Sequence, residues 1–272
     1  YTRDYVNTQS ARMEKFFPEE IKQELHGVVK GLKAAGIDDL TYEDIRTGIT
    51  QAEILHFPPD GPPACSNFAC WGKWTTDGRL LHGRNLDWNI EGDAQDDHVL
   101  LVWRPKGGTP FMMVGWAGGI GSVSGMNSKG ITIGEMTLPS PDATFDGLPL
   151  LLQMRLILEK TDNLDDAVRF LKNCKRTSGW NFIIGDGKVP DGRALETDAK
   201  YCTDFKPMDP KENEETGHWG MVDCVRRTNH PTAMDQLMRL ALAFGPKFNV
   251  NVETEEDLKA LLPVLKTQNS YM

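Results

Sequence analysis

The chain has 272 residues, 39% of them hydrophobic and 25% charged, which is the balance of a globular protein with a buried core. The formal net charge of −9, with no basic stripe, argues against nucleic acid as a partner. No run of about 18 apolar residues is present, so we expect no membrane span. The five cysteines are an odd, sparse set without a CxxC pair, which argues against a disulfide scaffold and a structural zinc site. We expect neither a metal nor a cofactor.

The chain opens with a pattern typical of helices. Pro18 and the two glutamates after it begin a helix whose apolar residues recur at helical spacing. Thr41 begins a second helix, with a carboxylate three residues on and an apolar stripe that runs to Leu55. Residues 58–63 (Pro-Pro-Asp-Gly-Pro-Pro) cannot continue a helix. They form a stiff connection at which a chain can be cut without unravelling a core.

The rest of the chain alternates groups of strands with groups of helices. Short β runs separated by turn signals fill residues 65–138. Strands, a helix pair, strands and helices in this order predict a mixed α and β fold in stacked layers. The later elements are helices at 148–159 and 164–174, a hairpin of 180–185 with 193–197, a loop at 206–217, a strand near 221–226, and helices near 234–244 and 255–265.

The densest set of reactive side chains lies between residues 65 and 88. A strand, a tight turn and a return strand would set Arg84 and Asp87 beside Cys65. A free thiol has a pKa of about 8.5, and a permanently charged guanidinium such as Arg84 favours its ionised form. Asp87 can orient the amine of a terminal cysteine. An α-amine, with a pKa of roughly 7.7 to 8.0, can act as the base for its own side chain.

Three motifs occur in a fixed order along the chain. The block 83–87 reads Gly-Arg-Asn-Leu-Asp, residues 118–130 hold a glycine-rich strand and a GMN turn, and residues 228–231 read Thr-Asn-His-Pro. Together they resemble the N-terminal-nucleophile hydrolases of the choloylglycine hydrolase, penicillin V acylase and isopenicillin N acyltransferase-like group. The likeness runs, with gaps, from about residue 20 to residue 240.

The resemblance implies an α+β fold, a four-layer αββα sandwich preceded by a helical leader. It also implies self-cleavage between Ala64 and Cys65. Residues 1–64 would then be the leader or propeptide, which becomes the alpha subunit after cleavage. Residues 65–272 would be the αββα catalytic domain, or beta subunit.

The resemblance also assigns roles within the site. It places the nucleophile on Cys65, an electrostatic and substrate-orienting role on Arg84, and the positioning of the amine on Asp87. Asn229 would donate to the oxyanion. A backbone donor falls, by count from the GMN turn, at Thr137, where related bile-salt enzymes carry asparagine.

The implied function is a thiol hydrolase of linear, non-peptide amide bonds that works through an acyl-thioester on a small-molecule N-acyl amide. Three alternatives stay open. The same thioester can serve an acyltransferase, and a non-catalytic relative can simply bind an acyl ligand. A Cys-His hydrolase without self-cleavage would instead pair Cys65 with His82, His98 or His230.

Plainer interpretations also apply to single residues. Arg84 and Asp87 fit a surface ion pair, and Asn229 fits a cap for the helix after Pro231. Arg239 fits either the late arginine of the group or a surface position on a helix. Ala64 stands where many relatives carry glycine, which leaves slow or absent cleavage open.

The ends of the chain and its assembly carry further expectations. The first residue is Tyr1 rather than methionine, so we expect an upstream segment to have been removed. The group usually carries more strand after its closing helices, so an end at Met272 fits either a truncated chain or a shortened sheet edge. A homo-oligomer and the cellular compartment are left open.

Overall fold

The computed structural model describes residues 1–55, 65–87, 95–212, 220–233, 237–239, 242, 253–257 and 259–260. The helices in these ranges are α1 (Arg3–Glu14), α2 (Glu19–Ala34), α3 (Tyr42–Leu55), α4 (Leu150–Lys160) and α5 (Leu164–Asn173). The strands are β1 (Ser66–Gly72), β2 (Gly78–Asn85), β3 (His98–Trp103), β4 (Phe111–Trp116), β5 (Ser124–Asn127), β6 (Ile131–Thr137), β7 (Trp180–Asp186), β8 (Asp191–Thr197), β9 (Cys202–Phe205) and β10 (Cys224–Arg227).

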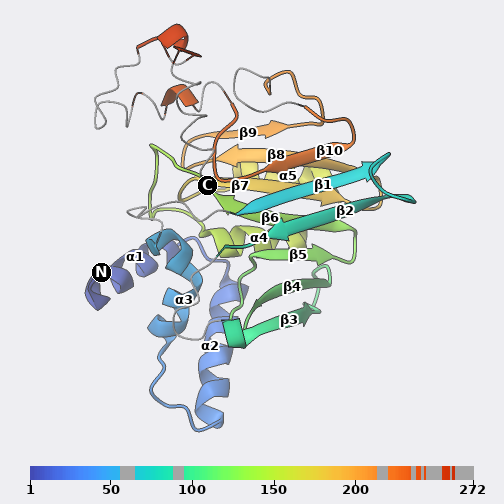
Figure 1. The fold of residues 1–272 in the computed structure, drawn as a ribbon. Coiled ribbons are helices and arrows are strands. Elements are labelled where there is room, and N and C mark those ends of the chain that lie inside the picture. Colours follow the sequence, from blue (N-terminus) through green and yellow to red (C-terminus); the bar gives the residue numbers. More distant parts are fainter. Residues whose placement is uncertain are drawn as a thin grey trace.

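Two antiparallel sheets lie face to face (Figure 1). The larger follows chain order, β3-β4-β5-β6-β7-β8-β9, so each strand pairs with its sequence neighbours. The smaller has the order β10-β1-β2, which brings a late strand beside the first one. β1 contacts β6, β7 and β8, so the small sheet lies over the second half of the large sheet.

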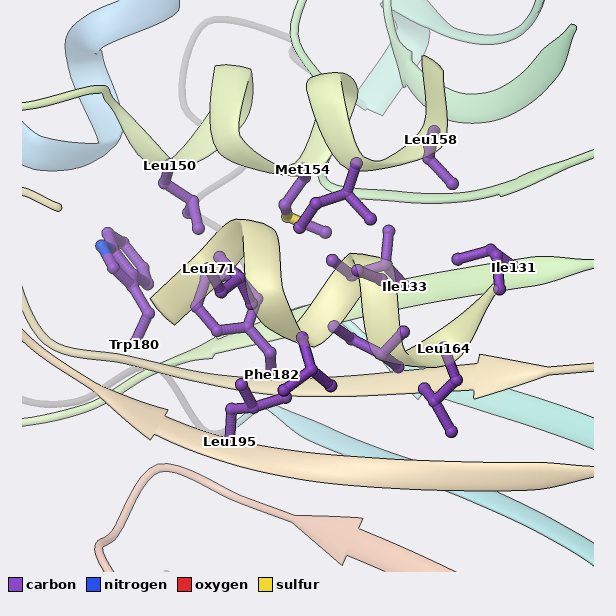
Figure 2. Close-up of a cluster of buried hydrophobic side chains, with 14 of the residues drawn as sticks. Ile131, Ile133, Leu150, Met154, Leu158, Leu164, Leu171, Trp180, Phe182 and Leu195 are labelled. Carbon is purple, nitrogen blue, oxygen red and sulfur yellow. The ribbon is translucent and has the colours of Figure 1, made fainter. Parts of the chain in front are cut away.

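Helices α4 and α5 connect β6 to β7 and cover the other face of the large sheet. Figure 2 shows Leu150 and Met154 of α4 and Leu171 of α5 pointing toward Phe182 of β7 and Leu195 of β8. All five side chains are buried. Removing each from water contributes about 1.5 to 3 kcal/mol, so this layer holds much of the stability of the fold.

The N-terminal helices share a second core with α4. Ile21 and Leu25 of α2 are fully buried against Leu152 and Leu156 of α4. Arg155, also fully buried, donates from both terminal nitrogens to Glu24 of α2 at 2.6 and 2.7 Å. The N-terminal helices therefore pack against α4 through apolar burial and an ion pair.

The layers confirm the predicted α+β class of stacked sheets. In the part of the chain that the structure describes, a layer of helices covers one face of the large sheet and the small sheet covers the other face. The expected helices near 234–244 and 255–265 fall mostly outside the described residues, as does the proline-rich connection. None of the described helices combines the length and the apolar composition needed to cross a membrane.

Most predicted elements are confirmed, with two additions. α1 was not predicted because it carries no clear apolar stripe, and only Ser10 and Met13 of it are buried. β9 was not predicted because its four residues are too short to show an alternating pattern. β9 gains its place by pairing with β8 at the edge of the large sheet.

Glu53 joins α3 to the start of α4. Its Oε1 accepts hydrogen bonds from the backbone N–H of Leu150 and from the hydroxyl of Thr177. The carboxyl is fully buried, and this burial raises the pKa of Glu53 from 4.5 to about 7. Between pH 4.5 and about 7 the folded state keeps a proton on Glu53 that the unfolded chain has released. Protonated Glu53 therefore favours the folded state at low pH, and this stabilisation is lost as the pH rises to about 7.

We predict that Glu53→Gln removes this pH dependence. A shift of this size corresponds to about 3 kcal/mol, which the wild type loses between about pH 4.5 and 8 and the variant keeps. Urea unfolding of both proteins at about pH 4.5 and pH 8 measures the difference. Glu43→Gln, an exposed change on the same helix, serves as the control and should follow the wild type. Identical pH profiles for wild type and Glu53→Gln would contradict the prediction.

Candidate active site

The β1–β2 hairpin brings Cys65 beside the end of the 83–87 block. Ser66 pairs with Asn85, so Cys65 lies opposite the residues that follow β2. The Cys65 side chain is buried, with 4% exposure, and its Sγ lies 3.9 Å from the carbonyl oxygen of Asp87. The expected approach of residues 65 and 87 is therefore present. Ala64, the other side of the expected cleavage site, lies outside the described residues.

Arg84 reaches across from the small sheet into the large one. Its Nε donates to the carbonyl of Glu135 at 2.8 Å, and a terminal nitrogen donates to the hydroxyl of Ser124 at 3.2 Å. A second terminal nitrogen pairs with the carboxylate of Glu135. With side-chain exposures of 7% and 3%, Arg84 and Glu135 form a buried ion pair, so Arg84 is not half of a surface pair with Asp87.

The backbone of β6 makes room for this arginine. The pairing of β5 with β6 runs from Ser124↔Gly134 to Met126↔Thr132, so the carbonyl of Glu135 lies beyond that ladder and can accept from Arg84. A Cβ on Gly134 would lie 2.3 Å from Nδ2 of Asn67 and 2.9 Å from Cδ of Arg84. Only glycine permits this approach of the two sheets.

The electrostatics of the thiol include a charge beyond the expected one. Burial raises the pKa of Cys65 first, and the negative charge of Glu135 raises it further, while Arg84 lowers it. Arg84 therefore favours the thiolate as expected, but Glu135 offsets its charge and the pKa of the thiol is raised on balance. In the intact chain the thiol keeps its proton at neutral pH and needs a base to remove it.

Asn229 and Thr137 lie together. Nδ2 of Asn229 donates to the carbonyl of Thr137, the last residue of β6, at 2.8 Å. Because an amide nitrogen carries two hydrogens, one remains to serve another acceptor. Cys65 packs in one buried cluster with Met136, next to Thr137, and with Ala233, shortly after Asn229. Sequence neighbours of both predicted oxyanion residues therefore pack in the cluster that contains Cys65.

Asp87 meets the thiol through its backbone rather than its side chain. Its Oδ1 accepts a hydrogen bond from Nδ2 of Asn85 at 3.0 Å, and the residue is exposed. The carboxylate is thus oriented by a neighbour within the same block. Its predicted role, to hold the amine of a terminal Cys65, stays a prediction.

The three histidines of the rival hypothesis have other partners. Both ring nitrogens of His82 are engaged, with Thr132 at 2.6 Å and Asn67 at 2.7 Å. Burial lowers the pKa of His82 to about 4, so the ring is neutral at physiological pH. The ring of His98 packs at a tilt against a tryptophan of β4, and Nδ1 of His230 lies 2.6 Å from a threonine hydroxyl. None of these contacts involves Cys65.

Arg239 forms ion pairs with Asp142 at 2.6 Å and Asp198 at 2.9 Å, and its guanidinium lies over the ring of Tyr201. These contacts give Arg239 a structural explanation. Within the described ranges, no group of three or more His, Cys, Asp or Glu residues could hold a metal ion.

Sequence reasoning missed two buried polar residues of this region. Glu135 is the partner of Arg84, and Asn181 of β7 bonds to the segment that carries Asn229. Both stand among apolar residues of largely buried strands. A carboxylate or amide in such a strand is costly to bury without a partner. The presence of these two residues among apolar neighbours therefore could have indicated buried polar contacts.

Comparisons with known proteins identify similar chains. Residues 74–206 match the family model described as acyl-coenzyme A:6-aminopenicillanic acid acyl-transferase. An uncharacterized protein of Archaeoglobus fulgidus is 32% identical over 202 residues, which cover 68% of this chain and 34% of that protein. Human acid ceramidase is 25% identical over 226 residues, which cover 71% of this chain and 55% of that protein.

Two solved structures also resemble the chain. An N-acylethanolamine-hydrolyzing acid amidase ortholog of Caenorhabditis elegans has a TM-score of 0.47 and 15% identity, over 72% of this chain and 85% of that one. Penicillin V acylase of Agrobacterium tumefaciens has a TM-score of 0.41 and 15% identity, over 73% of this chain and 63% of that one.

The predicted resemblance is confirmed at the level of these relatives: the chain is similar to the penicillanic acid acyl-transferase family and to the acid ceramidases. The chain spans about a third of the length of the Archaeoglobus protein and just over half of the length of human acid ceramidase.

We predict that removing either member of the Arg84–Glu135 ion pair shifts the pKa of the Cys65 thiol, in opposite directions for the two residues. Glu135→Gln removes the negative charge that disfavours the thiolate, so the pKa of Cys65 should fall. Arg84→Met removes the cation that favours the thiolate, so the pKa of Cys65 should rise. The pH dependence of iodoacetamide alkylation at Cys65, followed by peptide mass, measures both shifts. Shifts of the same sign in the two variants would contradict the assigned electrostatics.

Proposed function

We propose that this chain carries the core of a cysteine-nucleophile hydrolase of linear, non-peptide amides. The observation that carries the proposal is the position of the Cys65 thiol, buried just before β1 and 3.9 Å from the Asp87 carbonyl at the end of the 83–87 block. The proposal includes self-processing between Ala64 and Cys65, with residues 1–64 as leader and 65–272 as catalytic domain.

The proposed reaction begins with a proton transfer at Cys65. After processing, the α-amine of Cys65 takes the thiol proton, and the sulfur attacks the amide carbonyl. A sulfur–carbon bond forms, the carbonyl π electrons move onto oxygen, and Asn229 donates a hydrogen bond to this oxyanion. The backbone N–H of Thr137 is the proposed second donor.

The second half of the reaction releases both products. The protonated amine gives its proton to the leaving nitrogen, the carbon–nitrogen bond breaks, and an acyl-thioester remains on Cys65. Water then attacks the thioester, and the amine assists by accepting a proton from that water. The released acid leaves the thiol restored.

The uncut chain is expected to be latent. Before cleavage the nitrogen of Cys65 belongs to a peptide bond and cannot act as a base. The raised pKa of the buried thiol adds to this, because the sulfur does not ionise unaided at neutral pH. Processing would supply the missing base without any other change in the site.

The substrate class proposed is a small-molecule N-acyl amide. Human acid ceramidase is named for ceramide, which is itself an N-acylated amine, so its name supports an amide of this kind. The matched family model is described as an acyl-transferase, and this observation favours acyl transfer to a second amine as the alternative fate of the thioester.

The first test of this function is the nucleophile itself. We predict that Cys65→Ala abolishes both self-cleavage and turnover, because no other group replaces the sulfur. Intact-mass and N-terminal analysis of the purified protein measure the cut, and a panel of N-acyl amines measures turnover. Cys70→Ala, on the same strand, is the control and should retain both. A fully active, uncut wild-type chain would refute the N-terminal mechanism.

The second test addresses the carboxylate. We predict that Asp87→Asn lowers kcat by about 10²- to 10⁴-fold, since a neutral amide orients the amine base less well. The melting temperature should stay close to that of the wild type, because Asp87 is exposed. Steady-state kinetics and thermal unfolding measure the two quantities. Loss of the fold in Asp87→Asn would point to a structural role instead.

A further inference from the structure

The segment that carries Asn229 is anchored by one side chain of β7. Nδ2 of Asn181 donates to the carbonyl of Thr228 at 2.7 Å and to the carbonyl of His230 at 3.1 Å. These carbonyls belong to the residues on either side of Asn229. Asn181 thereby uses both of its amide hydrogens to hold the backbone around a single residue.

The next strand anchors the other end of the same segment. Glu196 of β8 accepts from the backbone N–H of Thr232 at 2.7 Å and from its hydroxyl at 2.6 Å. Its second oxygen accepts from the N–H of Ala233 at 3.3 Å. Asn181 and Glu196 are direct cross-strand partners, so they project from the same face of the large sheet.

The face of the large sheet that carries Asn181 and Glu196 packs against the region of Cys65. Ile183, two residues after Asn181 and therefore on the same side of β7, packs in the buried cluster that contains Cys65. Asn181 itself is fully buried. Burying an amide is tolerated only when its hydrogens are used, and here both serve the two residues that flank Asn229.

We propose that Asn181 is a positioning residue that fixes the carboxamide of Asn229 for the oxyanion. The inference rests on the proposed function, in which Asn229 is an oxyanion donor. Two anchored carbonyls hold the backbone of Asn229, and the bond from its Nδ2 to Thr137 sets the rotation of the side chain. Glu196 holds the following residues, so the chain cannot lift away beyond His230.

The inference is testable because two reactions of the same thiol depend differently on the oxyanion site. An alkyl trifluoromethyl ketone, such as 1,1,1-trifluoro-2-decanone, adds reversibly to the Cys65 sulfur. A sulfur–carbon bond forms and the carbonyl π electrons become an oxyanion. Iodoacetamide instead forms a sulfur–carbon bond by displacing iodide, and no oxyanion arises. The ratio of the two isolates the oxyanion site from the reactivity of the thiol.

Asn181→Leu keeps the approximate volume and removes both donors. In the processed protein, we expect the ketone to bind about 10- to 100-fold more weakly, because a displaced oxyanion donor is largely lost. The alkylation rate of Cys65 should stay within about twofold of the wild type. For a turnover substrate, kcat should fall while KM changes little, since the donor acts in the transition state.

A matched control exists on the opposite side of the large sheet. Asn127 of β5 is also buried, and its Nδ2 also donates to two carbonyls, those of Leu158 at 3.0 Å and Thr161 at 2.8 Å. Asn127→Leu should lower the melting temperature and leave the ratio of ketone affinity to alkylation rate unchanged. It therefore reports what a purely structural loss does.

The outcomes separate this inference from the proposed function. If Asn229→Ala weakens ketone binding and Asn181→Leu does not, the inference is wrong and the proposed function stands. Equal losses of ketone affinity and alkylation in Asn181→Leu would also overturn it, as a general disturbance of the site. If the wild type neither binds the ketone nor alkylates faster at Cys65 than its unfolded chain, both are refuted.

Discussion

The buried ion pair of Arg84 and Glu135 is the constraint on which the arrangement of the site depends. Two charges taken out of water are tolerated only when they meet with good geometry, and removing either one leaves the other unpaired. Arg84 comes from the small sheet and Glu135 from the large sheet, so the pair fixes one sheet on the other. Cys65 lies just before β1, the strand that pairs with the strand of Arg84, so its position follows from this register.

The same pair sets the chemistry of the thiol. A lone arginine would favour the thiolate, but an arginine neutralised by a glutamate does so much less, and burial then dominates. The side chain of Cys65 is therefore a protonated thiol that needs a base to act as the proposed nucleophile. In the proposed mechanism that base appears only when the chain is cut, which would couple activity to processing through simple electrostatics.

The N-terminal helices, proposed as the leader, are less separate from the layers that follow than their places in the sequence indicate. α2 and α3 contribute to a core shared with α4, and Glu53 of α3 bonds to the first turn of α4. α4 in turn packs on the strand that ends at Thr137. A leader bound in this way would remain attached after a cut, because its buried apolar surface does not depend on the peptide bond at residue 64.

Local sequence pattern predicted most of the elements. The helical spacing after Pro18, the alternating runs after Cys65 and the turn signals are each formed by residues that lie only a few positions apart. The motifs likewise indicated Cys65, Arg84 and Asp87, since all three lie in one continuous stretch of the sequence between residues 65 and 88. The sequence could not indicate that Glu135 neutralises Arg84, or that Asn181 and Glu196 hold the segment around Asn229. Those partners stand 36 to 51 residues apart along the chain, and only the stacking of the two sheets brings them within hydrogen-bond distance. Tertiary structure decides such contacts because buried polar groups take whichever partner the packing places beside them.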